Sequence, residues 1–216
     1  MRRASHRLAS SGQICTEGMQ VIRPSMRGRI LDEGLKLACV RGLCRVTFGA
    51  VAQRANVSKS GVVAHFCKVD ELKAAIIARA MDRWRRACPL PQVNSPAVAE
   101  LTRYMSHWIS WTTRAGIPGG CPIASAMIEY NYEGNSVRLA LRAAQARWRE
   151  TLVDLIEGAM SAEELSPTID ASQMAWSLFG VYLSHQVSRH FLRAVDADRQ
   201  AVESVEQLIA FAKRQN

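Results

Sequence analysis

Residues 47–66 read TFGAVAQRANVSKSGVVAHF, the pattern of two short helices joined by a tight turn. The hydroxyl of Thr47 is suited to accept a hydrogen bond from a backbone N–H group at the start of the first helix. Val51 and Ala55 then share one helical face. Asn56 marks the turn because asparagine tolerates left-handed backbone better than most residues other than glycine. The stretch therefore predicts a helix-turn-helix.

The second helix of this stretch has one apolar face and one mixed face. Ser58 is placed to cap the helix, and Val62 and Phe66, four residues apart, form its buried side. Its other side chains are short, polar or cationic. Such a surface suits the DNA major groove, where a closely docked helix meets base edges and phosphates. An ordinary helical hairpin with a solvated face is the alternative.

A small group of residues makes up the predicted DNA-binding surface, in which Thr47 stands at the start of the first helix. The residues assigned to phosphates are Lys59, His65 and Lys68. The residues assigned to base edges are Ser58, Ser60, Val63 and Ala64. The last two are apolar and suit thymine methyl groups. For each of these residues, simple solvent exposure is the alternative interpretation.

Positive charge is concentrated in the part of the chain that contains this motif. The chain carries a net charge of +9. Through Arg86 there are 17 Lys and Arg against 6 Asp and Glu, a net charge of +11, and the remainder has 11 against 13, a net charge of −2. Counterion release from a polyanion would therefore favour binding by the first part only. The basic residues do not line one face of an amphipathic helix, so nucleic acid is preferred to a membrane surface.

Composition indicates a globular protein. The chain has 216 residues, 48% of them apolar and 22% charged, enough for one large or two small domains. A transmembrane helix is not expected because no run of about 18 apolar residues occurs. The first 24 residues lack the apolar core of a secretory signal, which predicts a cytoplasmic location. Met1, Met19 and Met26 are alternative translation starts.

The cysteines and histidines do not predict a metal site or a cofactor. The six cysteines lack C-x-x-C spacing, and reduced thiols are expected. Cys121 follows a glycine-rich stretch, where a redox role and an inert packed thiol are the two alternatives. His185 and His190 are five residues apart, which does not place two ligands on one helix face. A position on or near a dimer surface is expected for both.

The periodicity along the chain predicts an all-α protein. A flexible basic arm over 1–24 is followed by a helix over 25–41, the helix-turn-helix and a long helix to about Ala87. The arm is also a candidate to reach a minor groove. Three prolines within 89–96 predict a domain boundary. The expected domains are the arm 1–24, a DNA-binding domain with its connecting helix at 25–87 and a ligand-binding and dimerisation domain at 88–216. Helices in the last domain are expected over about 97–115, 122–132, 135–160, 170–194 and 198–213.

Aromatic residues recur at helical spacing in the second half, where a packed core is the simpler interpretation. An apolar cavity between helices of a bundle is nevertheless a common site for a hydrophobic ligand. The candidate lining residues are Trp84, Trp108, Met127, Tyr130 and Trp148.

These motifs together resemble the TetR family of transcriptional regulators. The resemblance is carried by ILDEGLKLACVRGL at 30–43, by the helix-turn-helix stretch and by Asp70-Glu71-Leu72 at the start of the long helix. GGCPIASAMIEY at 119–130, before a long helix with a central tryptophan, is similar to one branch of the family. The resemblance covers about 25–213.

The resemblance implies a homodimer that places one helix of each subunit, 58–66, in successive major grooves of a palindromic operator. It also implies that a small molecule bound in the carboxy-terminal part shifts the connecting helix and changes the spacing of the two reading heads. The helices over 135–160 and 170–194 are expected to form the dimer interface.

Three positions depart from the family pattern. Val63 stands where an aromatic residue is usual, and Val69 stands where a lysine is usual, with Lys68 directly before it. Both departures bear on affinity and operator choice. Asn56 replaces the usual turn glycine, which the backbone tolerates.

The sequence thus predicts a DNA-binding regulator, a repressor released from its operator by a small apolar effector. A regulator of the same fold that responds to a protein partner or a thiol modification is the first alternative. A helical enzyme with a basic steering surface is the second. No nucleophile elbow, phosphate-binding glycine loop, dinucleotide-binding fingerprint or H-E-x-x-H motif occurs, so an enzyme is not expected.

Overall fold

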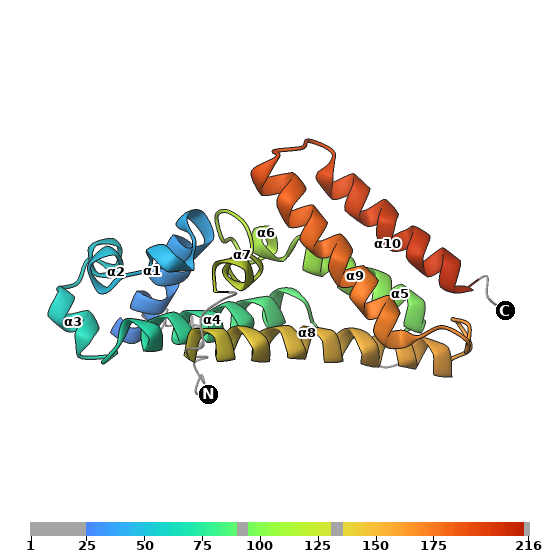
Figure 1. Ribbon diagram of the computed structural model, residues 1–216, viewed down its shortest axis with the longest axis horizontal. Helices are drawn as coiled ribbons and strands as arrows, with labels where there is room; N and C mark the ends of the chain where they lie inside the picture. Colours follow the sequence, from blue (N-terminus) through green and yellow to red (C-terminus); the bar gives the residue numbers. More distant parts are fainter. Residues whose placement is uncertain (1–24, 90–94, 131–135, 214–216) are drawn as a thin grey trace, which may run out of the picture.

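The computed structural model describes residues 25–89, 95–130 and 136–213. Within these ranges every regular element is a helix, as the periodicity predicts. The helices form an elongated arrangement, with α1 to α3 at one end and α9 and α10 toward the other (Figure 1). The predicted basic arm at 1–24 lies outside the described residues.

The first helices form the predicted helix-turn-helix. They are α1 (Met26–Arg41), the short 3-10 turn η1 (Leu43–Arg45), α2 (Phe48–Ala55) and α3 (Lys59–Val63). The backbone N–H of Gly28 donates to the Ser25 hydroxyl (3.1 Å), which caps α1. α1 covers the helical pair, because two short helices bury too little apolar surface alone. The residues buried in this core include Ile30, Leu35, Val51, Val62 and Phe66.

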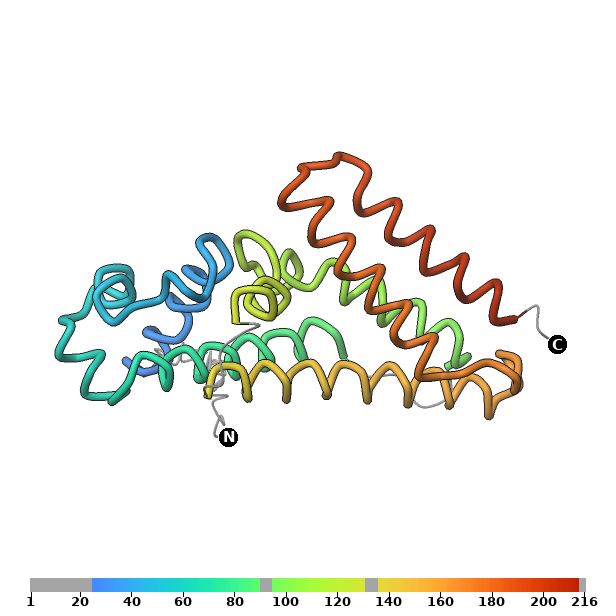
Figure 2. The backbone as a smooth tube through the Cα atoms, viewed as in Figure 1, coloured from blue at the N-terminus to red at the C-terminus, as the bar shows by residue number. Residues whose placement is uncertain are grey.

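The long helix α4 (Val69–Ala87) connects the two parts of the molecule. Near its start Leu72 and Ile76 are fully buried with the helix-turn-helix core. Near its end Trp84 packs against aromatic side chains of α5 and α8. α4 and α8 run side by side, and the tube in Figure 2 shows both along the length of the molecule. One rigid element therefore belongs to two cores.

The second part contains α5 (Ala97–Ile109), α6 (Trp111–Arg114), α7 (Pro122–Glu129), α8 (Ser136–Ser161), α9 (Ala171–Gln186), the π-type turn η2 (Val187–Phe191) and α10 (Ala197–Lys213). Within the described ranges, no helix is both long enough and apolar enough to span a membrane.

Two predicted helices in this part are shorter than expected. The helix predicted over 97–115 is interrupted at Ser110, whose hydroxyl donates to the carbonyl of Ser106 (2.8 Å). The helix predicted over 170–194 ends at Gln186 and continues only as η2. None of the residues in η2 is buried, so the core no longer supports a regular helix there.

Candidate DNA interface and aromatic core

α3 is held in place by its cap and by two buried side chains. The Ser58 hydroxyl accepts a hydrogen bond from the Gly61 N–H (3.0 Å) and shares another with the Ser60 hydroxyl (3.0 Å). Val62 and Phe66 are buried, with 0% and 1% of their surface exposed. The orientation of α3 is therefore determined by its apolar face, and its other face points away from the core.

The predicted DNA-binding residues lie on this outer surface. All of them are exposed, including Val63 at 43%. Thr47 is exposed at the start of α2, where its hydroxyl accepts from the Ala50 N–H (3.1 Å). The two serine hydroxyls already have partners within α3, whereas Lys59 and Lys68 form no salt bridge within the described residues. The surface thus combines two uncommitted cations with short side chains.

The corner between α2 and α3 has the backbone conformation that the sequence predicts. Asn56 has φ 50° and ψ 55°, in the left-handed region. The N–H of Val57 then donates to the carbonyl of Ala52 (3.0 Å). The guanidinium of Arg29 donates to the carbonyl of Ala55 (2.7 Å), so that α1 supplies a cation to the carboxyl end of α2. The turn is thereby anchored from both sides.

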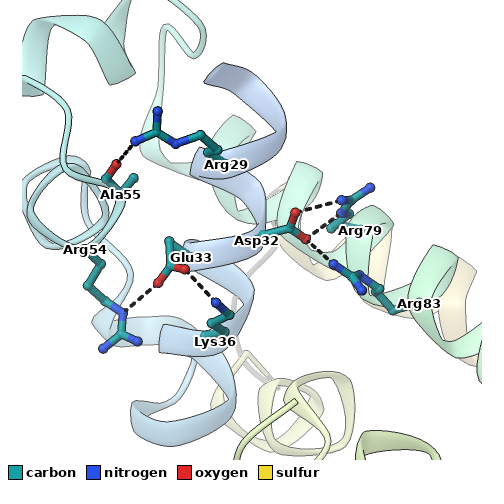
Figure 3. Close-up of polar contacts among 8 residues, drawn as sticks. All are labelled: Arg29, Asp32, Glu33, Lys36, Arg54, Ala55, Arg79 and Arg83. Carbon is teal, nitrogen blue, oxygen red and sulfur yellow. Dashed lines mark hydrogen bonds and ion pairs between the residues drawn. The ribbon is translucent and has the colours of Figure 1, made fainter. Parts of the chain in front are cut away.

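An ion cluster that the sequence analysis does not anticipate ties α1 to α4 (Figure 3). The Asp32 carboxylate accepts two hydrogen bonds from Arg79 (2.9 and 2.8 Å) and one from Arg83 (2.9 Å). Burial alone would raise the pKa of Asp32, but the hydrogen bonds and charges of the two arginines outweigh it and lower the pKa. The sequence does show that Arg79 and Arg83 are four residues apart, a spacing that places both on one face of α4.

A second ion cluster links α1 to α2. Glu33 lies between Lys36 (2.7 Å) and Arg54 (3.6 Å), and Figure 3 shows it on the side of α1 that faces α2. The start of α4 is fixed separately, because the Glu71 carboxylate accepts from the Cys67 N–H (3.0 Å). Lys68 is left exposed at the cap position of α4 with no side-chain capping bond. The helices that carry the predicted DNA-binding surface are therefore held in place by ion pairs, whereas the cations of that surface are not used in those ion pairs.

One contact joins the helix-turn-helix directly to the second part of the chain. The carboxylate of Glu129, at the end of α7, accepts a hydrogen bond from the Cys44 N–H (2.7 Å) in η1. The backbone of the preceding Gly42 has φ 85°, and a Cβ atom there would lie 2.5 Å from the Glu129 carboxylate. Glycine is therefore required by both the conformation and the close approach.

Three of the five predicted ligand-lining residues come together in one aromatic core. The Trp84 ring lies 6.0 Å from that of Trp108 and 5.7 Å from that of Trp148, and the last two are 5.2 Å apart. Further members of this core were not among the predicted lining residues, although their spacing along α5 and α9 indicates a shared face. They are Tyr104, Phe179 and Tyr182.

Met127 and Tyr130 are not part of this core. They line a separate open hollow of about 440 Å³ between α7 and α8. The Lys73 ammonium lies 5.3 Å from the Tyr130 ring centre, a cation–π contact. The predicted lining set therefore divides between two places in the molecule.

The tryptophans of the aromatic core are incompletely hydrogen-bonded. Within the described part of the chain, the buried indole N–H groups of Trp84, Trp108 and Trp148 have no partner. An unpaired buried donor costs about 1–3 kcal/mol. By contrast, Trp111 donates to the Tyr182 hydroxyl (3.0 Å). The three unpaired donors thus lie in one cluster of aromatic rings.

Among the residues that the structure describes, the buried thiols and the histidines do not form a reactive centre. Burial raises the pKa of the Cys121 thiol and raises that of Cys88 to about 12, so neither forms a nucleophilic thiolate readily. His185 is buried, and its Nε2 lies 2.7 Å from a carboxylate oxygen of Asp198. His190 is exposed. No metal-binding group of His, Cys, Asp or Glu occurs among the described residues.

Comparison with solved structures shows the same fold in several transcriptional regulators. A TetR-family regulator from Agrobacterium tumefaciens has a TM-score of 0.75 at 17% identity, covering 88% of this chain and 99% of that one. A TetR-family regulator from Cytophaga hutchinsonii has a TM-score of 0.72 at 18% identity, covering 86% and 94%. AibR, solved in complex with isovaleryl coenzyme A and operator DNA, has a TM-score of 0.65 at 20% identity, covering 87% and 98%.

The family assignment comes from the second part of the chain. A sequence search of curated proteins finds no significant match. The family model described as Tetracyclin repressor-like, C-terminal domain, matches residues 97–205, about half of the chain. Together with the helix-turn-helix at 47–66, this match shows that the chain belongs to the TetR family of transcriptional regulators.

Proposed function

We propose that the protein is a sequence-specific DNA-binding repressor that leaves a palindromic operator when a small apolar effector binds. The observation that carries this proposal is the outer face of α3, which is exposed, rigidly held and lined by short side chains and cations. Lys59, His65 and Lys68 are proposed to contact phosphates. The proposed base-facing residues are Ser58, Ser60, Val63 and Ala64, with Thr47 at the edge of the surface.

The proposal assigns one task to each part of the chain. Residues 25–87 would bind DNA, with 1–24 as a basic arm, and 88–216 would bind the effector and form the dimer. α4 is suited to couple the two tasks, since Trp84 lies in the aromatic core while Leu72 lies in the helix-turn-helix core. A shift of α4 would change the spacing of two α3 helices on DNA.

A homodimer is proposed because operators of this kind are read by two-fold symmetric pairs. The sequence predicts α8 and α9 as the interface, whereas the surface favours α9 with α10. Two shallow hollows of about 230 and 270 Å³ lie between α9 and α10. Small residues such as Gly180, Ser184 and Ser204 line one of them, and Phe211, 62% exposed, lines the other. Small side chains allow helices of a partner to approach closely.

Response to a small molecule is supported by the aromatic core and by one structural relative. One of the three unpaired indole donors, Trp84, belongs to α4, and the rings of Trp108 and Trp148 pack against it. AibR, which shares the fold, was solved with both an acyl coenzyme A and operator DNA. A regulator switched through the thiol of Cys121 or Cys88 is less well supported, because burial raises the pKa of both. A regulator that responds to a protein partner, or a helical enzyme, has no specific observation in its favour.

The test is binding of the purified protein to DNA fragments that flank its own gene, with and without excess non-specific competitor. A complex that resists competitor at one palindromic fragment is expected. If competitor removes all binding at every fragment, the protein is only a basic protein with general affinity for polyanions, and the proposal fails.

A further inference from the structure

Beside the aromatic core, α8 carries a line of polar side chains that faces two hollows. Arg142, Gln145 and Arg149 are spaced three and four residues apart, so they lie on one face of the helix. Arg142 and Gln145 line the hollow of about 440 Å³, and Gln145 and Arg149 line a more enclosed hollow of about 50 Å³. Gln145 therefore lines both hollows.

The charge on this face is not explained by the stability of α8. Arg138 and Arg142 are like charges four residues apart, an arrangement that destabilises a helix. Arg138 also lies in the first turn of α8, where the helix dipole disfavours cations. Within the described residues Arg142 and Arg149 form no salt bridge, and neither hollow is lined by Asp or Glu. Within the described residues the site therefore presents guanidinium groups and no carboxylate to a ligand.

The smaller hollow leads directly to the aromatic core. Its lining includes Trp176 and Phe179, and the Phe179 ring lies 6.1 Å from that of Trp108 and 6.3 Å from that of Trp148. Phe179 is only partly buried. At about 50 Å³ the hollow is too small for an organic effector, so Phe179 must move for a ligand to reach the core.

The core behind Phe179 offers hydrogen-bond donors to an acceptor. The indole N–H groups of Trp84, Trp108 and Trp148 are buried and unpaired within the described residues. A purely hydrocarbon ligand would leave these donors unpaired, whereas a carbonyl or ether oxygen would accept a hydrogen bond from them.

We propose that the effector is an organic anion of two parts. Its apolar body carries an acceptor oxygen and enters past Phe179 to the three tryptophans, and its carboxylate or phosphate stays outside with Arg142 and Arg149. This inference depends on the proposed function for its regulatory meaning, since the ligand site acts on DNA binding through Trp84 in α4. The effector, predicted from the sequence to be apolar, would thus also carry an acidic group.

The test uses fluorescent naphthyl ketones, 6-acyl-2-(dimethylamino)naphthalenes, whose acyl chain ends in a carboxylate, a phosphate monoester or a carboxylic methyl ester. Titration of the DNA-free protein should show that the carboxylate or the phosphate probe binds about tenfold more tightly than the neutral ester, as expected for charge-assisted hydrogen bonds. The tighter of the two anions identifies the natural head group.

Two sets of variants locate the binding site. Arg142→Gln and Arg149→Gln should each weaken the favoured anionic probe about tenfold and leave the ester unchanged. Arg147→Gln is the matched control, because Arg147 is exposed on α8 but lines a different hollow beside α4. The proposal would be overturned by any of three results. These are equal affinity for the anionic and neutral probes, equal effects of all three variants on probe affinity, and no binding of any probe.

The acceptor is tested by emission wavelength, because hydrogen bonding to the ketone shifts its emission to the red. At least one of three variants should shift the emission of the bound probe to the blue. These variants are Trp84→Phe, Trp108→Phe and Trp148→Phe. Trp111→Phe should not, since the Trp111 N–H is already bonded to Tyr182. If no variant shifts the emission, the acceptor part of the proposal is wrong.

DNA binding is measured separately on the same protein without a probe. Failure there with normal probe binding would reject the proposed regulator and leave the ligand chemistry in place. Normal DNA binding without probe binding would reject only the ligand chemistry.

Discussion

At the scale of single residues, Lys59 is the clearest candidate for contact with DNA. It is exposed at the amino end of α3, where a cation opposes the helix dipole. Helix stability therefore does not explain a lysine at this position. A phosphate contact does, because the cation then releases a counterion from the DNA.

Lys59→Ala should weaken binding to all DNA sequences and lower the slope of log K against log salt by about one unit. The measurement is a salt titration of DNA affinity. Lys213→Ala, an exposed lysine at the end of α10, is the control and should leave the slope unchanged. An unchanged slope for Lys59→Ala would remove this residue from the phosphate contacts.

Asp32 gives the link between α1 and α4 a defined pH dependence. Its pKa is below the ordinary value of 3.8 because the hydrogen bonds and charges of Arg79 and Arg83 outweigh the effect of burial. Because the pKa of Asp32 is lower in the folded state than in the unfolded state, the carboxylate stabilises the fold fully at pH values above the unfolded pKa. This stabilisation is lost as the pH falls through the pKa that Asp32 has in the folded protein.

Asp32→Asn should reduce the free energy of unfolding by about 1–3 kcal/mol at neutral pH, since charge-assisted hydrogen bonds to two arginines are weakened. The difference from wild type should shrink as the pH falls below about 4. Urea unfolding at a series of pH values measures both quantities. A difference that is constant down to the lowest pH at which the protein folds would contradict this role of the carboxylate.

At the scale of elements, the helix-turn-helix depends on one backbone conformation. Asn56 adopts φ 50°, a region where a side chain with a Cβ costs about 1–2 kcal/mol and glycine costs little. The corner also uses Arg29 and the Val57 N–H, so it is supported from α1 and α2. The angle between α2 and α3, and with it the exposed face of α3, follows from this turn.

Asn56→Ala and Asn56→Gly test this dependence as a matched pair. The alanine variant should be about 1 kcal/mol less stable than the glycine variant, because only glycine accepts the left-handed conformation without steric cost. Denaturant midpoints at equal m-value give the comparison. Equal stability of the two variants would mean that the turn relaxes to another conformation.

At the scale of the whole molecule, the proposed dimer face can be separated from its alternative. Gly180 in α9 and Gly158 in α8 are both exposed, and a Cβ atom at either position would meet nothing within 4 Å. A glutamate is therefore accommodated in the monomer at both positions, and the helix gains from losing a glycine. Any effect on association then reports the interface alone.

Gly180→Glu should shift the protein from dimer to monomer, because it places charge on the face shared by α9 and α10. Gly158→Glu should remain dimeric. Light scattering after size-exclusion chromatography distinguishes these outcomes. Dissociation by Gly158→Glu as well as by Gly180→Glu would instead place the interface on α8 and α9, as the sequence predicts.

Local features were predictable from the chain because their causes are local. The caps at Thr47 and Ser58, the left-handed Asn56 and the apolar spacing in α1 to α4 depend on residues within a few positions of each other. These features predicted the helices and the face that α3 exposes. The uneven charge was equally visible, since it depends on composition alone.

The partners of buried and charged side chains were decided only by tertiary structure. Helical spacing shows that a side chain such as Trp84 is buried, but not that Trp108 and Trp148 surround it while Met127 lies elsewhere. Asp32 likewise meets Arg79, 47 positions away, only because α1 crosses α4. Contacts of this kind depend on how helices cross after the loops close. The sequence by itself therefore determined the helices and the helix-turn-helix, and the tertiary structure determined the aromatic core and the hollows that Arg142 and Arg149 line.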